Sequence, residues 1–484
     1  MKKYQSLVVV LFFPLFAYAQ AADTVSAPKL LTLEDALRVA LSENASVKVA
    51  DMEIERTGYA RKGTYSSLFP QISGSGSYQR TIKKQVMYMD FDMGGFGGGD
   101  SADDAGAGAG AGAAAGASSG GGIEVGRWNT WSAGISASMP LVNAQLWKNL
   151  KISGEEVELA VEKARSSRLE TVNQVKQAFF SCLLAREAFA VYRSVYENAL
   201  ENLEQTQKKY NAQRASELDL TRAKTAVANA VPNVYDAESS VLLALWQLKA
   251  VMGVDLDENI DVAGTLGDYG RQMTAAGYDG AGLTLENNSS LRQLAIQAEQ
   301  LADAVKIQQY AYLPTLALSF NYSLNAMTND FNFSEYRWSP YSFVGLSLSI
   351  PIFSGGQRLN AVRQARVQAA ELDIQRTNAE RQLRIAIRQY LNQMETANKS
   401  LGSAQSALET AQKAYDIASK SYAVGRSTLT DLNDAQLALT QSQLAVSQAV
   451  YNYVVAKSNL ESTLGADFIE ADGKVQLNNT YDNE

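Results

Sequence analysis

The sequence contains the same pattern twice, and this duplication limits the folds that the chain can adopt. The segment KKYNAQRASELDL at 208–220 returns as KSYAVGRSTLTDL at 420–432. Three pairs show an offset of 244 residues early in the chain and 212 residues later: Pro70 and Pro314, Tyr210 and Tyr422, and Gly253 and Gly465. The difference reflects an insertion of about 30 residues in the first copy. The sequence therefore predicts two matching halves built from the same elements.

The duplication divides the 484 residues into five predicted regions. A secretory signal peptide covers 1–21, because Lys2 and Lys3 precede an apolar run and a small-residue cleavage region. The other regions are a first repeat at 22–252, a linker at 253–283, a second repeat at 284–466 and a polar tail at 467–484. Each repeat is expected to hold a helix, two strands and a long helical hairpin. The signal peptide indicates that the mature protein leaves the cytoplasm.

The composition excludes several classes of chemistry. Histidine is absent, which removes histidine-dependent triads and most zinc sites. The single cysteine, Cys182, lies in an apolar helical run, so we expect a buried small side chain rather than a reactive thiol. The net charge of -8 argues against nucleic acid or an anionic membrane surface as the partner. No later segment approaches the roughly 18 to 20 apolar residues of a spanning helix, so any membrane crossing must use strands.

Four segments alternate apolar and small polar residues with a period of two, at 72–78, 130–139, 315–322 and 344–350. Each has about the 10-residue length of a tilted transmembrane strand. Aromatic residues typical of membrane interfaces gather near their ends: Trp128, Trp131, Tyr336, Trp338 and Tyr341. A soluble sandwich with one wet face is the alternative. Because four strands cannot close a barrel, the membrane interpretation requires several chains.

The segments from Pro140 to Tyr210 and from Pro351 to Tyr422 contain little that would break a helix. At about 1.5 Å per residue, each would extend roughly 100 Å. The last predicted helix carries two apolar stripes: Leu432, Ala435, Leu439, Ser442, Val446, Ala449, Tyr453 and Ala456, and Leu437, Thr440, Leu444, Ser447, Tyr451 and Val454. A helix with two seams contacts a neighbour on each side, which favours a curved wall of helices.

The insertion occupies 82–127, and its centre consists almost entirely of Gly, Ala, Ser and Asp. Such a segment cannot bury a core, so we expect a solvated loop. Its entry also offers a conceivable soft-metal site formed by Met87, Met89, Met93, Asp90 and Asp92, which is the less favoured alternative.

Three stretches resemble the TolC family of outer membrane efflux proteins: LTLEDALRVALSEN at 31–44, SIPIFSGG at 349–356 and YAVGRSTLTDLNDA at 422–435. The resemblance covers nearly the whole mature chain. It implies an α+β membrane protein that assembles as a homotrimer. Each chain would contribute four strands to one 12-stranded β-barrel, and its long helices would line a tunnel through the periplasm.

The resemblance also implies site residues at the periplasmic tips of the two helical hairpins. One tip, for adaptor docking and closure, would comprise Tyr422, Val424, Gly425, Ser427, Thr428 and Leu429, and the other Ala212, Gln213, Arg214 and Ser216. The constriction carboxylates would be Asp431 and Asp434, and Asp219 would accept a closing hydrogen bond from Tyr422. Arg426 stands one place before the position where some relatives carry a gating arginine. Gln213 departs from the pattern, because the second copy has glycine there.

A structural role competes with the gate at these positions. Ser216 to Asp219 and Thr428 to Asp431 both fit the S/T-x-x-D capping pattern, so Asp431 is equally well explained as a helix cap. Asp434 is harder to explain as a cap, because its counterpart in the first copy is Arg222.

The sequence and the resemblance together predict a passive outer membrane exit duct of a Gram-negative bacterium that extends into the periplasm. Its expected partners are two further copies of the chain, outer membrane lipid, a periplasmic adaptor and an inner-membrane pump of a tripartite efflux or type I secretion system. We expect no cofactor and no enzymatic activity, since no nucleophile–base pair or phosphate-binding loop is present. A periplasmic or surface coiled-coil structural protein without a barrel is the alternative.

Overall fold

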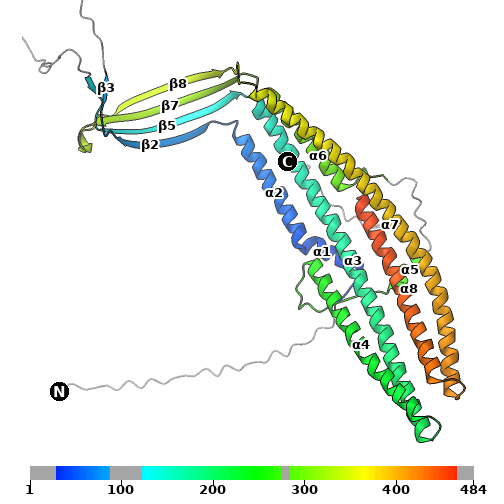
Figure 1. The fold of residues 1–484 in the computed structure, drawn as a ribbon. Coiled ribbons are helices and arrows are strands. Elements are labelled where there is room, and N and C mark those ends of the chain that lie inside the picture. Colours follow the sequence, from blue (N-terminus) through cyan, green and yellow to red (C-terminus); the bar gives the residue numbers. More distant parts are fainter. Residues whose placement is uncertain (1–28, 88–122, 274–283, 466–484) are drawn as a thin grey trace, which may run out of the picture. The chain divides into compact units, whose positions relative to one another are not determined.

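The computed structural model describes residues 29–87, 123–273 and 284–465 (Figure 1). The predicted signal peptide, the polar tail and most of the Gly/Ala-rich insertion, with Met89, Asp90, Asp92 and Met93, lie outside the described residues. The long strands are β2 (Gln71–Arg80), β5 (Asn129–Val142), β7 (Thr315–Thr328) and β8 (Ser339–Ser349). The helices are α1 (Leu33–Glu43), α2 (Ala45–Ser66), α3 (Ala144–Asn211), α4 (Glu217–Met252), α5 (Leu266–Met273), α6 (Ser289–Tyr310), α7 (Gln357–Ala423) and α8 (Leu429–Leu464).

The described residues fall into two compact units. One, here called the strand unit, consists of Ala50–Ala164 and Ser289–Arg381. The other, the helical unit, is formed by the remaining parts of the chain. The strand unit takes one stretch from each predicted repeat, and the helical unit takes the described remainder of both. Corresponding elements of the two predicted repeats therefore lie in the same unit.

The strand unit contains a four-stranded antiparallel sheet in the order β2-β5-β7-β8, which Figure 1 shows as one curved layer. All four predicted strands are present, and β5 and β7 each extend to 14 residues. The prediction that a helix begins near Pro140 was wrong. Strand β5 continues through this residue to Val142 with a bulge, because proline lacks the N–H that a ladder needs but fits at an irregular position.

The ends of the four strands that connect to long helices lie at the same end of this sheet. Gln71 pairs with Ser138 near the end of β5, and Thr315 pairs with Ser349. At the opposite end of the sheet, aromatic rings lie together, as the sequence predicts. The Trp131 ring centroid lies 4.3 Å from that of Tyr78 and 5.2 Å from that of Phe333. Aromatic side chains therefore mark the far strand ends.

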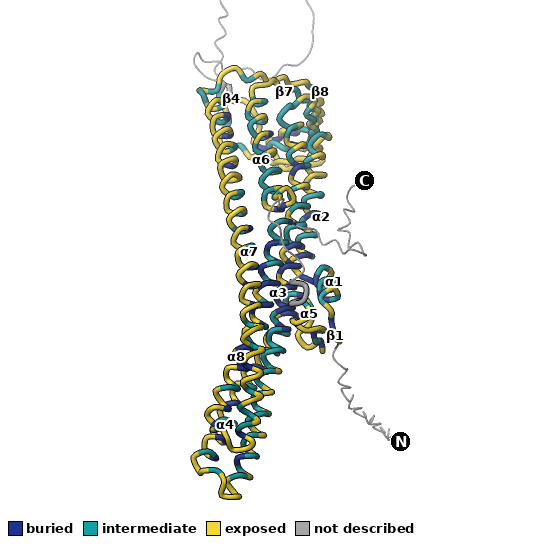
Figure 2. The backbone as a smooth tube through the Cα atoms, turned by 90° about the vertical axis from the view of Figure 1, so that its right-hand side faces the viewer, coloured by how far each residue is buried: buried dark blue, intermediate teal, exposed yellow. Residues whose placement is uncertain are grey.

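The helical unit has a core formed by α1, α3, α4, α5, α7 and α8 together with the short parallel pair β1 (Lys29–Leu31) and β6 (Ile260–Val262). Phe179, Leu248 and Leu460 have no exposed surface. Figure 2 shows the buried residues in dark blue along the middle of α3. Cys182 is also fully buried, and burial together with the charge of Asp261 raises the pKa of its thiol to about 12. This confirms the prediction of an unreactive core cysteine.

The long helices occur in pairs of matched length. Helices α3 and α7 have 68 and 67 residues, α4 and α8 have 36 each, and α2 and α6 have 22 each. At 1.5 Å per residue, α3 and α7 extend about 100 Å, as predicted. Within the described residues, no helix combines the length and apolarity needed to cross a membrane.

Helix α8 shows how the two predicted stripes differ. Most of the first stripe is buried, including Leu432, Leu439 and Tyr453. In the second, Thr440, Ser447 and Val454 are buried, whereas Leu437 is 57% exposed. One chain thus fills one seam and leaves part of the other uncovered.

Candidate functional site

The α3–α4 and α7–α8 turns, both in the helical unit, form two tips with the same backbone geometry. Helix α7 ends with Gly425 N–H bonded to Tyr422 C=O and Arg426 N–H bonded to Ser421 C=O. Helix α3 ends in the same way, through Gln213 and Arg214. This pair of hydrogen bonds is the Schellman motif, which requires a residue in the left-handed conformation after the helix. Gly425 has a φ of 78° and Gln213 a φ of 59°. Gln213 therefore adopts the same left-handed conformation, although the second copy has glycine at this position.

Gln213 is the single non-glycine residue with positive φ among the described residues. A residue with a side chain costs about 1–2 kcal/mol in this region of φ. Substitution by glycine removes this cost, but the greater conformational entropy of glycine in the unfolded chain offsets part of the gain. We expect Gln213→Gly to stabilise the α3 tip by about 0.5–1 kcal/mol. Hydrogen exchange should then slow at the last amides of α3, while Gly425→Gln should accelerate it at the end of α7. Equal exchange in Gln213→Gly and the unaltered protein would contradict this reading of the turn.

Capping boxes begin the helix that follows each tip. Thr428 Oγ1 accepts from Asp431 N–H at 3.2 Å, and Asp431 Oδ2 accepts from Thr428 N–H at 2.9 Å and from its hydroxyl at 2.8 Å. These bonds from the backbone and side chain of Thr428 lower the pKa of Asp431. Ser216 and Asp219 repeat the arrangement. The capping interpretation of Asp431 is confirmed, and its carboxylate is charged at neutral pH.

A side-chain contact joins the two hairpins just behind the tips. The Thr206 hydroxyl donates to Asn202 C=O at 2.7 Å, so the Tyr422 hydroxyl donates to Thr206 Oγ1, 2.5 Å away. Lys209 Nζ donates to Tyr422 C=O at 2.5 Å and lies 4.0 Å from the centroid of its ring. Burial lowers the pKa of Lys209. We call Tyr422, Thr206 and Lys209 the latch.

An apolar cluster surrounds the latch. Ala223, Tyr422, Leu429 and Leu432 are buried together, with Leu203, Tyr415 and Ala418 packed around them. The hydroxyl contact of the latch is therefore shielded from water, and a hydrogen bond is worth more there than at an exposed surface. The ammonium contact is partly buried.

Two predicted roles need correction. The hydrogen bond from Tyr422 to Asp219 is not formed in this structure, because the single hydroxyl hydrogen of Tyr422 goes to Thr206 and Asp219 belongs to the capping box. Leu429 is 2% exposed and fills the cluster between the hairpins, so it cannot present a surface to an adaptor. As the first residue of α8, it faces inward once Thr428 caps the helix.

The other predicted tip residues lie at the surface. Ala212, Gln213, Arg214 and Arg426 are exposed, as is Ser216, and Val424 is 70% exposed. Ser427 is half-buried and donates to Ala418 C=O. Asp434 is exposed and lies on α8 three residues after Asp431, and no described residue contacts it through a hydrogen bond or ion pair. Figure 2 shows both tips largely in yellow, the colour of exposed residues.

Thr206 and Lys209 were missed at the sequence level. Both lie inside an unbroken helix, where threonine and lysine are ordinary residues. Thr206 precedes the repeated segment, and Lys209 lies in it but has Ser421 as its counterpart in the second copy. Among the residues that the structure describes, no group of three or more carboxylate or thiol side chains is placed to hold a metal ion.

Comparison with known proteins identifies the family of this fold. A family profile described as outer membrane efflux protein matches residues 36–254 and 281–466. The chain belongs to this family. The match spans both hairpins with their tips and stops short of the predicted tail.

Relatives of this outer membrane efflux protein include the outer membrane protein TolC of Vibrio cholerae, which is 22% identical over 69% of this chain and 76% of that protein. TolC of Escherichia coli is also 22% identical, over 70% of each chain. The alkaline protease secretion protein AprF of Pseudomonas aeruginosa is 26% identical over half of each. The family is one of efflux channels rather than enzymes, and these relatives place the chain in the outer membrane of a Gram-negative bacterium.

Solved structures share the fold. The Campylobacter jejuni CmeC outer membrane channel superposes with a TM-score of 0.69 at 18% identity, covering 90% of this chain and 85% of that one. The Vibrio cholerae outer membrane protein VceC gives a TM-score of 0.68 at 15% identity, with coverage of 90% and 97%.

Proposed function

We propose that this efflux protein is one subunit of a passive homotrimeric exit duct whose strands cross the outer membrane as a 12-stranded barrel. The observation that supports this most directly is the open sheet. Strands β2 and β8 each pair on one side only, which leaves two backbone edges without partners within the described chain. An open edge is unfavourable in a bilayer, where no water can satisfy it. Three copies joined β8 to β2 would close a barrel.

The mass of the detergent-extracted protein tests this proposal. After subtraction of detergent, light scattering should give three times the mass of the mature chain, which is slightly below the 52.4 kDa of the full sequence. The trimer should partition with outer membranes and dissociate only on heating. A monomer in the soluble periplasmic fraction would overturn the barrel and favour the alternative of a periplasmic coiled-coil structural protein.

We further propose that the tips form the periplasmic gate, powered from an inner-membrane pump through an adaptor. The family is described as one of outer membrane efflux proteins, and one relative is named for protease secretion, so both efflux and type I secretion suit this duct. Exposed Val424, Arg426, Ala212, Gln213 and Arg214 are the residues that an adaptor would meet first. The duct itself is proposed to carry out no covalent chemistry and to need no cofactor.

In the proposed trimer, Asp431 and Asp434 would place six carboxylates around one opening. Such a ring favours cations through its negative potential. Asp434→Asn is the sharper substitution, because it removes three charges while the Thr428–Asp431 cap stays intact. We expect the cation preference in planar-bilayer recordings to fall.

Asp373→Asn on α7 is the matched control, since this exposed carboxylate lies outside the helical unit that contains the tips. It should leave selectivity unchanged. If the Asp434→Asn channel has the same selectivity as the unaltered protein, Asp434 is not part of the selective ring at the gate.

A further inference from the structure

The helix ends nearest the sheet carry an excess of positive charge that the chain as a whole does not show. Four helix ends lie next to the sheet in sequence: α2 and α6 end five residues before β2 and β7 begin, α3 begins two residues after β5 ends, and α7 begins eight residues after β8 ends. The ten terminal residues of each on this side contain eight basic side chains: Arg61, Lys62, Lys148, Lys151, Lys306, Arg358, Arg363 and Arg366. They contain one acid, Asp303, in a chain of net charge -8.

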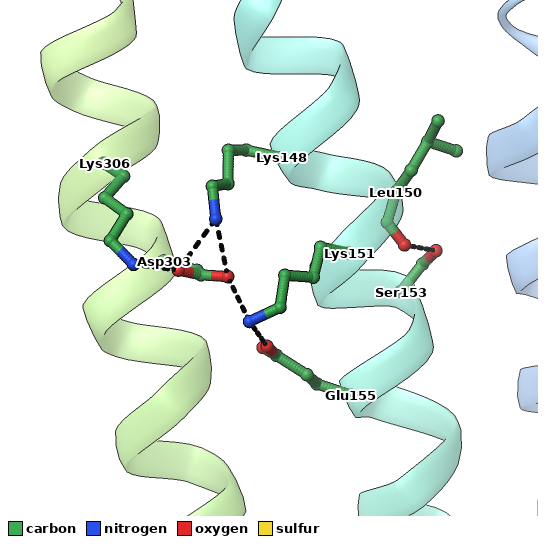
Figure 3. Close-up of polar contacts among 7 residues, drawn as sticks. All are labelled: Lys148, Leu150, Lys151, Ser153, Glu155, Asp303 and Lys306. Carbon is green, nitrogen blue, oxygen red and sulfur yellow. Dashed lines mark hydrogen bonds and ion pairs between the residues drawn. The ribbon is translucent and has the colours of Figure 1, made fainter.

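That acid is buried beneath three of the lysines (Figure 3). The Asp303 side chain is 2% exposed, with Lys148 Nζ at 3.1 Å, Lys151 Nζ at 2.9 Å and Lys306 Nζ at 2.9 Å. Glu155, one turn further along α3, pairs with Lys151 at 2.9 Å. Two carboxylates thus gather three ammonium groups. Lys151 and Lys306 remain 56% and 49% exposed, so they keep N–H donors for an outside acceptor.

Most of the other basic side chains point to solvent. Arg61, Lys62, Arg363 and Arg366 are exposed. Three aromatic rings lie beneath basic groups: Arg61 is 5.9 Å from the Tyr65 centroid, Lys62 is 5.7 Å from Tyr59, and Arg358 is 5.9 Å from Tyr312. We call the eight basic residues the cationic belt.

Polarity changes in order between the sheet and the belt. The strands β5, β7 and β8 contain no charged residue. The linkers that follow expose apolar side chains, among them Phe69 at 66%, Ile352 at 93% and Phe353 at 89%. The exposed rings of Tyr65, Trp147 and Tyr312 come next, together with the belt. Apolar, aromatic and then cationic residues are the order that a protein presents across a membrane interface.

We propose that the cationic belt binds the phosphate groups of anionic phospholipids in the periplasmic leaflet of the outer membrane. The proposal rests on the proposed function, which places the sheet in that membrane. A phosphodiester supplies acceptor oxygens for the exposed arginines and for the N–H donors that Lys151 and Lys306 keep, and a membrane supplies many at one level. The net negative charge of the chain does not prevent the belt from binding an anionic surface, because charges more than about 10 Å away are screened by salt.

Native mass spectrometry of the trimer released from bilayers of equal phosphatidylglycerol and phosphatidylethanolamine tests the proposal. We expect retained phosphatidylglycerol to exceed phosphatidylethanolamine by about fivefold, the effect of one well-placed cation at an anionic surface. Arg61→Gln combined with Arg363→Gln and Arg366→Gln should reduce this ratio toward one. The matched control replaces Arg376, Arg381 and Arg388, three exposed arginines further along α7, and should keep the preference.

Raising the salt concentration provides a second measurement that needs no variant. The preference of the unaltered trimer should fall as salt increases, because salt screens the contact. A trimer that conducts in bilayers yet retains both lipids equally would overturn the belt proposal alone. A belt variant that keeps the preference would do the same. Failure to form a trimer or a channel would instead overturn the proposed function.

Discussion

Replacing Tyr422 with Phe should raise the single-channel conductance of the purified trimer. The substitution keeps the ring in its apolar cluster and removes only the hydroxyl that donates to Thr206. Loss of a buried hydrogen bond costs about 1–3 kcal/mol, which shifts a closed tip toward separated hairpins roughly 5- to 150-fold. Lys209→Met should add to the effect, because it removes the bond to Tyr422 C=O and the contact with its ring.

Tyr415→Phe is the matched control. Tyr415 packs against the same cluster, and its hydroxyl forms no hydrogen bond with any residue that the structure describes. Its removal should leave conductance unchanged. If both phenylalanine variants conduct alike, the latch does not hold the gate closed, whatever the role of the tips in docking.

Replacing Asp303 with Ala should strongly destabilise the strand unit. The substitution leaves three ammonium groups facing one another, with only Glu155 nearby to balance them. Breaking a fully buried ion pair by removing one partner costs about 3–5 kcal/mol. Because Lys151 and Lys306 are about half exposed, we expect a loss toward the lower end of this range. We expect the helical circular dichroism signal of the trimer to be lost at a clearly lower temperature.

Glu409→Ala measures an ordinary ion pair for comparison. Glu409 and Lys413 lie 2.7 Å apart on α7, but their side chains are 72% and 70% exposed. Such a pair contributes at most about 0.5 kcal/mol. If the Asp303→Ala trimer melts at the same temperature as the Glu409→Ala trimer, the buried cluster is not a source of stability.

The Asp303 cluster should also be insensitive to mild acid. Burial raises the pKa of Asp303, but its hydrogen bonds with Lys306, Lys151 and Lys148 outweigh burial and hold the pKa well below the usual range. A lowered carboxyl pKa gives stability that is present above the unfolded value, near 3.9, and is lost as the pH falls through the folded value. The contribution should therefore be constant from pH 8 to pH 5, and the melting difference between Asp303→Ala and the unaltered trimer should not change over that interval.

Local signals carried most of the predictions about the tips. The capping boxes at Ser216 and Thr428 form from residues three positions apart, and a glycine at 425 indicates where α7 ends. Gln213 shows the limit of this reasoning. Its side chain does not favour a left-handed turn, yet the surrounding helices impose the conformation that the repeat leads one to expect.

Contacts between hairpins could not be predicted in the same way. The Tyr422–Asp219 bond inferred from family resemblance is replaced by a bond to Thr206, which is 216 residues from Tyr422 along the chain. The direction of each side chain around its helix axis decides which partner is reached. A position error of one residue rotates that direction by about 100°.

The sequence by itself determined the four strands, the long helices and their caps, because each depends on periodicity or on residues within one or two turns. Only the tertiary structure decided the latch, the burial of Leu429 and the gathering of basic residues around Asp303. Those features join segments more than a hundred residues apart, and their energies depend on desolvation and distance. Neither quantity exists until the helices and strands have packed.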